Sequence, residues 1–228
     1  TLPYSITVNP QPSYVTIEVQ DLVICSGEST ALGLVSPIGS IQWEISTDNT
    51  NFTPVANGNN SVLLTPNLTN TSATDSVFYF RAILGNAPCN SITTTSKIVT
   101  VTANPSAGIM SPDQTICEGD VPSAVSISGT LGTIEYWEID TLSSFATPVA
   151  FGSGLSSVSG SALGALTQTS YVRVITSNGV CSNDTSSSLV INVVNSPTNT
   201  IAEGDTICSG VTAGTLIGDQ PTSGNGSY

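Results

Sequence analysis

The spacing of the five cysteines is the feature that most constrains how this sequence can fold. Cys25 and Cys89 are separated by 64 positions, and so are Cys117 and Cys181. Corresponding members of the two pairs are offset by 92 positions, while Cys208 follows Cys117 by 91. The pairs therefore belong to two copies of one repeat, and Cys208 belongs to the beginning of a third copy.

Other stretches of sequence recur at the same or nearly the same spacing, with Tyr136 as one inserted residue in the second copy. The segments around the first cysteine of each copy read VICSGEST, TICEGDVPS and TICSGVTAG. GSIQWEIS, beginning at Gly39, matches GTIEYWEID, beginning at Gly132, and TPVA at Thr53 recurs at Thr147. VFYFRAIL matches SYVRVIT, and the copies close on KIVTVTANP and LVINVVNSP. Because self-similarity at a fixed period is typical of repeat arrays, we expect tandem modules.

Prolines lie where one copy gives way to the next, at Pro10, Pro12, Pro105 and Pro197. Proline fixes φ and cannot donate to a sheet ladder, so it ends a terminal strand and makes a short linker. We therefore expect the C-terminal strand of a preceding repeat at 1–10, complete repeats at 11–104 and 105–197, and the N-terminal part of a truncated third repeat at 198–228.

Short β-rich runs alternate with turn residues inside each copy, which predicts an all-β fold. Roughly seven strands in about 92 residues is the pattern of an immunoglobulin-like β-sandwich, a term used here for the architecture alone. A brief turn of helix is expected at 160–165. In the first complete copy the expected strands are Tyr14–Val19, Ala31–Val35, Ile41–Ser46, Ser61–Leu64, Val77–Leu84 and Lys97–Thr102.

The equal cysteine spacing predicts one disulfide within each complete repeat, because few charges and many hydroxyl and amide side chains are typical of a secreted domain. We expect the pairs Cys25–Cys89 and Cys117–Cys181, each tying loops at one pole of its sandwich. Cys208 is expected to be unpaired. The alternatives are free buried thiols or metal ligation, but the sequence has no histidine and no C-x-x-C motif, so we expect no metal site.

Charge and composition exclude several classes of function. The chain has 3 Lys+Arg against 16 Asp+Glu, a net charge of -13, whereas binding nucleic acid or an anionic membrane needs clustered basic residues. The lack of histidine removes the commonest general base. No apolar run approaches the roughly 18 residues that span a bilayer. We therefore expect no enzymatic activity, no cofactor, no nucleic-acid partner and no direct membrane insertion.

The tryptophans and arginines that recur in both copies are expected to have structural roles. Trp43 and Trp137 alternate with polar neighbours on a predicted strand, which favours the sandwich core over an exposed platform for sugar rings. Arg81 and Arg173 occupy equivalent positions at the 92-residue spacing. We expect each arginine to pair with a carboxylate or carbonyl of an adjacent strand rather than to bind a ligand.

Acidic residues near the cysteines are the remaining candidates for chemistry. Glu118 and Asp120 follow the first cysteine of the second copy, and Glu203 and Asp205 precede that of the third. Paired acids can act as acid and base or bind Ca²⁺. The first copy offers only Glu28 at this place, and the EF-hand ligand pattern is absent. Solvated loop charge is therefore the favoured interpretation, with calcium at a module joint as the alternative.

The combination of TICEGD, a GTIEYWEI strand, a YVRVI strand and a GVCS loop resembles a known family. It is similar to the immunoglobulin-like repeats of very large surface adhesins of gliding bacteria, such as the SprB-type mobile gliding adhesin, over nearly the whole chain. The resemblance implies type IX secretion, display at the outer membrane and gliding motility. It also implies neighbouring repeats, surface polysaccharide or substratum, and the secretion and motility machinery as partners. It offers no catalytic residues.

Three tripeptides resemble the Asp-(Ser/Thr)-apolar acceptor motif for O-glycosylation in bacteria with this secretion route. The alternative is a chance match in a chain rich in serine and threonine. The candidate acceptors are Ser76, Thr141 and Thr206, each preceded by aspartate and followed by an apolar residue.

Two functions remain open from the sequence. The favoured one is a non-catalytic structural and adhesive repeat region of a secreted cell-surface adhesin, as a gliding-motility adhesin fibre. The alternative is a carbohydrate-binding or spacer module of a secreted hydrolase. Both place the chain outside the cell.

Overall fold

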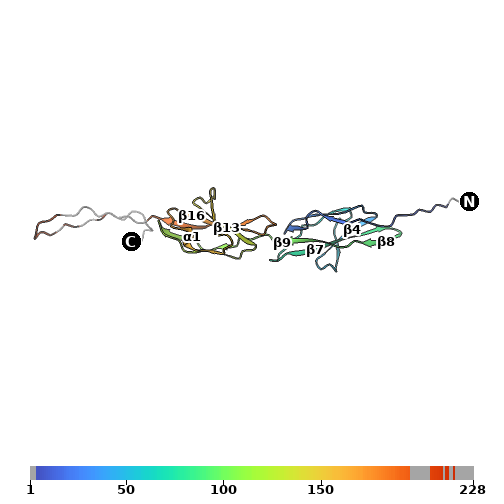
Figure 1. Ribbon diagram of the computed structural model, residues 1–228, viewed down its shortest axis with the longest axis horizontal. Helices are drawn as coiled ribbons and strands as arrows, with labels where there is room; N and C mark the ends of the chain where they lie inside the picture. The colour runs from blue at the N-terminus through green and yellow to red at the C-terminus, as the bar shows by residue number, and fades with distance from the viewer. Residues whose placement is uncertain (1–3, 196–205, 213, 216–217, 219–228) are drawn as a thin grey trace. The chain divides into compact units, whose positions relative to one another are not determined.

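The computed structural model describes residues 4–195, 206–212, 214–215 and 218, which form two compact units (Figure 1). The first unit comprises the chain up to Pro105 together with Asn178–Ser182, and the second comprises Ser106–Ser177 and the chain from Asn183. Each unit has a hydrophobic core of its own. The predicted all-β fold of tandem immunoglobulin-like sandwiches is confirmed. Most of the expected third repeat, 198–228, and residues 1–3 lie outside the described residues.

The first unit consists of a three-stranded and a six-stranded sheet. The smaller sheet has the order β1-β3-β6, and the larger has the order β2-β9-β7-β4-β5 with β8 beside β7. Only β2 and β9 pair in parallel among these strands. The strands are β1 (Ile17–Val19), β2 (Val23–Cys25), β3 (Ala31–Leu34), β4 (Ser40–Ser46), β5 (Thr53–Pro54), β6 (Val62–Leu64), β7 (Ser76–Asn86), β8 (Cys89–Thr93) and β9 (Lys97–Thr102).

The second unit repeats this topology. Its smaller sheet has the order β10-β12-β15, and its larger sheet has the order β11-β18-β16-β13-β14 with β17 beside β16. The elements are β10 (Ile109–Met110), β11 (Gln114–Cys117), β12 (Val125–Ser128), β13 (Thr133–Asp140), β14 (Val149–Phe151), β15 (Ser157–Val158), α1 (Gly160–Leu163), β16 (Ser170–Ser177), β17 (Asp184–Thr185) and β18 (Leu189–Val194).

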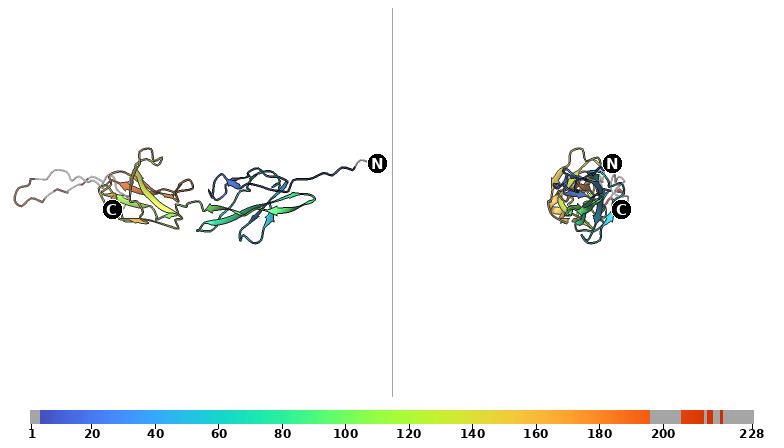
Figure 2. Two further views of the ribbon diagram at one scale, coloured as in Figure 1. Left: turned by 45° about the vertical axis from the view of Figure 1, so that its right-hand side comes forward. Right: turned by 90° about the vertical axis from the view of Figure 1, so that its right-hand side faces the viewer.

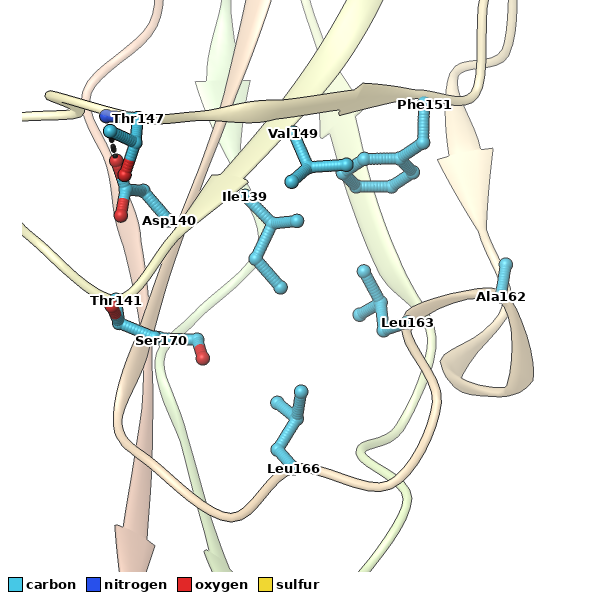
Figure 3. A pocket seen from close by; sticks show the side chains of 10 residues that line it. All are labelled: Ile139, Asp140, Thr141, Thr147, Val149, Phe151, Ala162, Leu163, Leu166 and Ser170. Atoms are coloured by element: carbon cyan, nitrogen blue, oxygen red, sulfur yellow. Dashed lines mark hydrogen bonds between the residues drawn. The ribbon is translucent and has the colours of Figure 1, made fainter.

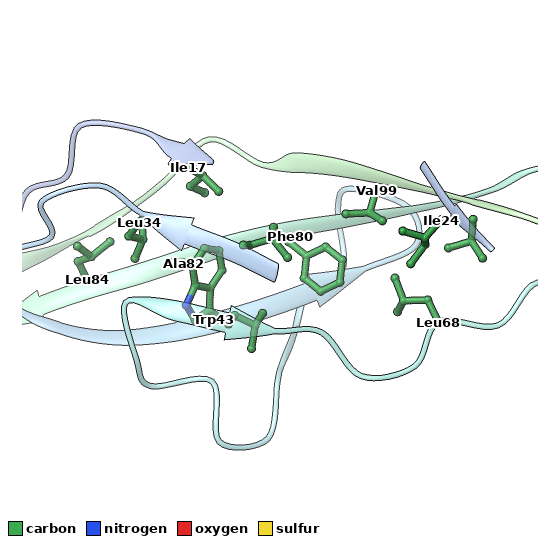
Figure 4. Packing of buried hydrophobic residues seen from close by; sticks show 12 residues of the cluster. Ile17, Ile24, Leu34, Trp43, Leu68, Phe80, Ala82, Leu84 and Val99 are labelled. Atoms are coloured by element: carbon green, nitrogen blue, oxygen red, sulfur yellow. The ribbon is translucent and has the colours of Figure 1, made fainter. Parts of the chain in front are cut away.

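Alternation of apolar and polar residues along the strands places the core between the two sheets of each unit. In β7, Phe80, Ala82 and Leu84 are fully buried, and Figure 4 shows them gathered with Trp43 of β4. β7 runs beside β9 along the unit (Figures 1 and 2). Trp43 and Trp137 are both 0% exposed, which confirms their predicted place in the core. Each indole N–H donates to a backbone carbonyl, at 2.9 and 2.8 Å respectively.

All six predicted strands of the first repeat are present, although β1 begins three residues later than expected, and β2, β5 and β8 were not predicted. These strands are short, and they exist because their backbones pair with longer neighbours rather than because their side chains alternate. The predicted helical turn is confirmed as α1. No helix in the described part of the chain is both long and apolar enough to cross a bilayer.

Residues 4–10 were expected to form the terminal strand of a preceding repeat. They carry no strand assignment in the structure. A strand needs a neighbour to accept and donate its ladder hydrogen bonds, and among the described residues none takes that place beside residues 4–10.

Candidate functional site

One disulfide joins Cys25, which ends β2, to Cys181, in the loop that follows β16. Their Cα atoms are 5.5 Å apart. Cys89 is a half-buried free thiol, whereas Cys117 and Cys208 are exposed free thiols. This arrangement corrects the expected pairs Cys25–Cys89 and Cys117–Cys181. The bonded cysteines come from two consecutive repeats, although the loop at Asn178–Ser182 packs within the first compact unit.

The expected pairing fails because the two cysteines of one repeat lie at opposite ends of its sandwich. Cys25 faces Thr102, the last residue of β9, and the residue before Thr102 faces Ser76 at the beginning of β7. Cys89 faces Asn86 at the end of β7. β7 has 11 residues, which at about 3.3 Å per residue separates the two cysteines by roughly 30 Å. A disulfide requires Cα atoms within about 7 Å.

The same separation holds in the second repeat. Cys117 faces Val194 at the end of β18, while Ile191 of that strand faces Ser170 at the beginning of β16. Cys181 comes after Ser177, the last residue of β16. The length of β16, roughly 25 Å, therefore lies between the two cysteines.

The first cysteine of every copy begins the same tight turn. The N–H of the fourth residue donates to the cysteine carbonyl at 3.1, 3.0 and 3.1 Å in the three copies. The third residue is always glycine, with φ of 93°, 86° and 90°, a left-handed conformation that favours glycine. The turns span residues 25–28, 117–120 and 208–211, so the beginning of the third copy adopts the geometry of the other two.

The acidic residues beside the cysteines hold these turns. A carboxylate oxygen of Glu28 accepts the N–H of Cys25 at 3.0 Å, and one of Asp120 accepts the N–H of Cys117 at 3.3 Å. Glu28, Asp120 and Glu118 are all exposed, as expected for solvated loop charge; Glu203 and Asp205 lie outside the described residues. Across the described residues, no group of three acids or thiols is placed to hold a metal ion.

Asn178 organises the loop around Cys181. Its side-chain oxygen accepts the N–H of Cys181 at 2.8 Å, and its side-chain nitrogen donates to the carbonyl of Ala103 at 2.6 Å. Asn104 in turn donates to the carbonyl of Ser26 at 3.3 Å. Sequence reasoning did not single out this asparagine. The available signal was that Asn86 precedes Cys89 by three positions, just as Asn178 precedes Cys181.

A second feature common to both repeats is a cluster of one arginine, one glutamate and one phenylalanine. Nε of Arg81 on β7 donates to Glu44 on β4 at 2.8 Å, and the guanidinium lies 3.8 Å from the centre of the Phe52 ring. The pairing predicted for the arginines is thereby confirmed. The second copy is built identically from Arg173, Glu138 and Phe145, with distances of 2.6 and 3.9 Å.

These clusters stabilise the sheet rather than offer chemistry. Glu44 and Glu138 have only 11% of their side chains exposed, and each carboxylate faces its arginine directly across the strands. A buried carboxylate whose charge is balanced by a guanidinium stacked on an aromatic ring is already satisfied. The available sequence signal was that the phenylalanine recurs between the copies at nearly the same offset as the arginine, 93 against 92 positions.

The turn after β4 and the turn after β13 are each organised by an aspartate that sequence reasoning did not single out. The N–H and side-chain amide of Asn51, the N–H of Thr50 and the hydroxyl of Ser46 hold the pKa of Asp48 far below its ordinary value. In the second repeat the carboxylate comes from Asp140 at the end of β13.

The N–H groups of Leu142 and Thr147 donate to Asp140 at 3.0 and 2.8 Å and lower its pKa, with a smaller contribution from the charge of Arg173. Both aspartates are therefore ionised turn anchors and are unsuited to proton transfer near neutral pH.

A family model matches residues 15–105 and again residues 106–195. The family is described as "Domain of unknown function (DUF8696)". The chain belongs to this family. It therefore contains two consecutive DUF8696 repeats, and the Cys25–Cys181 bond joins one repeat to the other.

Several solved structures are similar to this pair of DUF8696 repeats. One is a Ca²⁺-stabilised adhesin that helps an Antarctic bacterium bind ice, with 15% identity, a TM-score of 0.41, and coverage of 84% of this chain and 52% of that one. A marsupial T cell receptor has 12% identity, a TM-score of 0.49, and coverage of 83% and 77%. The fibronectin(III)-like modules of Clostridium thermocellum CbhA have 10% identity, a TM-score of 0.32, and coverage of 79% and 95%.

The chain thus spans about half the length of the Antarctic adhesin structure, 52%. The search of curated proteins gave no match.

A hollow of about 440 Å³ opens on the second DUF8696 repeat. Ile139, Val149 and Phe151 form one wall, and Leu163 and Leu166 face them across the hollow (Figure 3). The insertion that contains α1 creates the space. Leu68 is the counterpart of Leu166 in the first repeat. Leu166 lies eight positions after the end of β15, whereas Leu68 lies only four positions after the end of β6. Leu68 is only 3% exposed, while Leu166 is half-buried.

The three candidate glycosylation acceptors differ in their surroundings. Ser76 is half-buried, and its hydroxyl donates to the side-chain oxygen of Asn70 at 2.9 Å. Thr141 and Thr206 are exposed. An acceptor hydroxyl must be reachable by a transferase, so the structure favours the two threonines over the serine.

Proposed function

We propose that this chain is a non-catalytic, tension-bearing repeat region of a secreted cell-surface adhesin, the fibre of a gliding-motility adhesin. The observation that carries the proposal is the Cys25–Cys181 bond between consecutive DUF8696 repeats. A bond inside one domain stabilises only that domain. A bond between neighbours shortens the covalent path from one end of the array to the other, which is useful where the array is pulled.

The path can be followed along the chain. A pulling force that enters at the N-terminal end reaches Cys25, crosses to Cys181 and continues toward the C-terminal end. The 155 residues between the two cysteines lie inside the closed loop. They include most of the core residues of both repeats, with Ile17 and Ile24 of the first core and Leu189 and Ile191 of the second lying outside the loop. Force applied to the ends therefore bypasses most of each core.

Three further observations support an extracellular, non-catalytic chain. A structural disulfide persists only in an oxidising compartment. The surface is solvated mainly by hydroxyls and amides, with 8% charged residues and a net charge of -13, which discourages association between neighbouring fibres. Glu28 and Asp120 beside the cysteines accept backbone N–H groups, and the two arginines are paired with Glu44 and Glu138, so these groups have structural partners.

The proposal assigns adhesion to the assembled fibre rather than to a pocket of one repeat. Its partners are neighbouring repeats of the same chain, a surface polysaccharide or other substratum, and the machinery that exports the fibre by type IX secretion and moves it at the outer membrane. Many weak contacts along a repeated fibre add up to firm attachment, even when one repeat binds poorly.

An antibody raised against residues 11–197 tests this proposal on cells that produce the protein. Labelling of intact cells, with label that moves along the cell and attachment that the antibody blocks, is the expected result. A serum depleted on the purified chain provides the control. Label found only on a secreted hydrolase in the medium would refute the adhesin and support the spacer module.

One observation favours carbohydrate binding as a second candidate function. The lining of the hollow in the second repeat includes the ring of Phe151 and, across the hollow from it, Asp140, Thr141 and Ser170, and a pocket that combines apolar and a few polar groups suits a sugar ring. Glycan arrays probed with the wild-type chain and with Phe151→Ala decide the matter. Binding of one defined sugar that the substitution abolishes would establish this site, whereas no binding by either protein would remove it.

A further inference from the structure

The free cysteine of the first repeat sits in a loop built like the disulfide loop of the second. Asn86 and Asn178 occupy equivalent positions, three residues before the cysteine. Each side-chain amide donates to a carbonyl in the segment that leads into its own repeat, Pro10 at 2.8 Å and Ala103 at 2.6 Å. The same hydrogen bond from an asparagine side chain therefore holds the entering segment in both repeats.

The sulfur atoms take the same place relative to this entering segment. Sγ of Cys89 lies 3.8 Å from the carbonyl oxygen of Pro10, and Sγ of Cys181 lies 3.9 Å from that of Ala103. The sulfur of Cys181 is bonded to the preceding repeat, whereas the sulfur of Cys89 is free and half-buried.

The free cysteine of the second repeat likewise occupies the position of the bonded cysteine of the first. Cys25 faces Thr102 in the parallel pairing of β2 with β9, and Cys117 faces Val194 in the parallel pairing of β11 with β18. In both repeats the next residue donates its N–H to the facing carbonyl at 2.9 Å. Cys117 is exposed and free.

The register of the repeats explains why these two thiols are free in this chain. The bonded cysteines are 156 positions apart, which is one within-repeat spacing of 64 plus one period of 92. A partner for Cys117 would lie 156 positions after it, and a partner for Cys89 would lie 156 positions before it. Both positions fall outside the 228 residues.

We propose that Cys89 and Cys117 are half-sites for disulfides to further DUF8696 repeats. Cys89 bonds the first cysteine of a preceding repeat, and Cys117 bonds the second cysteine of a following repeat. Each bond forms from two thiols, which lose two protons and two electrons to a disulfide oxidant, which is itself reduced to two thiols. In an array, every repeat is then bonded to both neighbours, and the bonded intervals overlap along the chain.

A chain of four repeats built from this sequence tests the proposal. Residues 1–195 are followed by residues 10–228, so that Asn195 leads into Pro10 as Asn9 does in the natural chain. In the test chain, Cys89→Ser is made in the first copy and Cys117→Ser in the second. The remaining Cys117 then lies one repeat before the remaining Cys89, at the central joint.

The matched control exchanges the two substitutions between the copies. Cys117 then remains only in the last complete repeat and Cys89 only in the first, with the composition unchanged. Both chains are oxidised in a glutathione buffer, cleaved at aspartate and glutamate, which separate all five cysteines, and examined by mass spectrometry. A Cys25–Cys181 peptide with no free Cys25 or Cys181 peptide remaining reports that the repeats of both copies have folded.

The proposal predicts a Cys117–Cys89 peptide in the test chain that is at least about tenfold more abundant than in the control, because adjacent folded repeats hold the two thiols at a high effective concentration. Free thiols at both positions of the test chain, with both Cys25–Cys181 bonds formed, would overturn it. Equal yields in the two chains would also overturn it, since random oxidation does not depend on adjacency. Neither outcome depends on what the fibre binds.

Discussion

Glu138 carries a charge with 11% of its side chain exposed, and the guanidinium of Arg173 balances that charge from the neighbouring strand. Phe145 covers the guanidinium at 3.9 Å from the ring centre. The arginine is itself 27% exposed, so solvent screens part of the attraction and the pair is weaker than a fully buried one. The matching cluster in the first repeat shows that this arrangement belongs to the repeat rather than to one copy.

We predict that Glu138→Gln lowers the free energy of unfolding of the second unit by about 2 kcal/mol, because Arg173 then lacks a charged partner. Urea unfolding monitored by tryptophan fluorescence measures the change. Glu135→Gln is the control, since Glu135 lies on the same strand and is exposed, and it should change the free energy by less than about 0.5 kcal/mol. Equal effects of the two substitutions would contradict a special role for the cluster.

Asp140 gives the second unit a pH-dependent contribution to stability. Donation from Leu142 and Thr147 holds its pKa below the ordinary value of 3.8. A carboxyl whose pKa is lowered on folding stabilises the folded state above its unfolded pKa, and that contribution is lost as the pH falls through the folded pKa. We predict that the difference in unfolding free energy between wild type and Asp140→Asn is largest near neutral pH and shrinks below about pH 4.

Urea unfolding at a series of pH values measures this dependence. Asp21→Asn serves as the control, because Asp21 is exposed and no hydrogen bond to its carboxylate is described. A difference between wild type and Asp140→Asn that stays constant from neutral to acidic pH would show that the carboxylate charge does not anchor the turn.

At the scale of single elements, the positions of the cysteines follow from the strands that carry them. β2 and β11 run parallel to the terminal strands β9 and β18, which brings the first cysteine to the end where the chain leaves the repeat. β7 and β16 run the other way, so the loops after them lie at the end where the chain enters. Each repeat therefore presents one cysteine to each neighbour in the chain.

The short helix α1 also depends on one backbone position. A Cβ built on Gly160 would meet the carbonyl oxygen of Pro122 far inside van der Waals contact. We predict that Gly160→Ala destabilises the second unit by about 3 kcal/mol, because backbone atoms on both sides would have to move. Gly33→Ala, at a site with nothing within 4 Å of the added Cβ, should change stability by less than about 0.5 kcal/mol.

Differential scanning calorimetry of the two variants measures these effects. A Gly160→Ala protein that unfolds at the wild-type temperature would show that the α1 insertion moves freely relative to Pro122. The hollow beside Leu163 would then also lack a fixed wall.

At the scale of the whole molecule, the disulfide determines how far the chain can be stretched. Pulled from its two ends in the oxidised state, the chain cannot release the 155 residues between Cys25 and Cys181. At about 3.5 Å per residue, this segment amounts to roughly 540 Å of extended chain. We predict that single-molecule pulling gives a total extension shorter by about this length in oxidised than in reduced protein.

Cys25→Ser is the control for this measurement, since it should extend fully in either redox state. Equal extension of the oxidised and reduced wild-type chain would mean that the bond does not form in solution. A bond within one repeat would instead hide a segment of 63 residues between its cysteines, which is readily distinguished from 155.

The sequence by itself determined the repeat, the all-β sandwich, the buried tryptophans and the pairing of each arginine with a group on an adjacent strand. All of these depend on patterns along the sequence: a fixed period, alternation along a strand, and the recurrence of a charged residue at equivalent positions. The brief helical turn could also be predicted from the sequence, because glycine, serine and alanine interrupt the alternation of apolar and polar residues there.

Only the tertiary structure decided which cysteines are bonded. Equal spacing of 64 in both copies shows that the two positions are equivalent between repeats, but it carries no information about distance in space. The chain between Cys25 and Cys89 travels from one end of the sandwich to the other, because β7 runs the full length between them. The partner of Cys25 is therefore 156 positions away, in the loop that follows β16 of the next repeat.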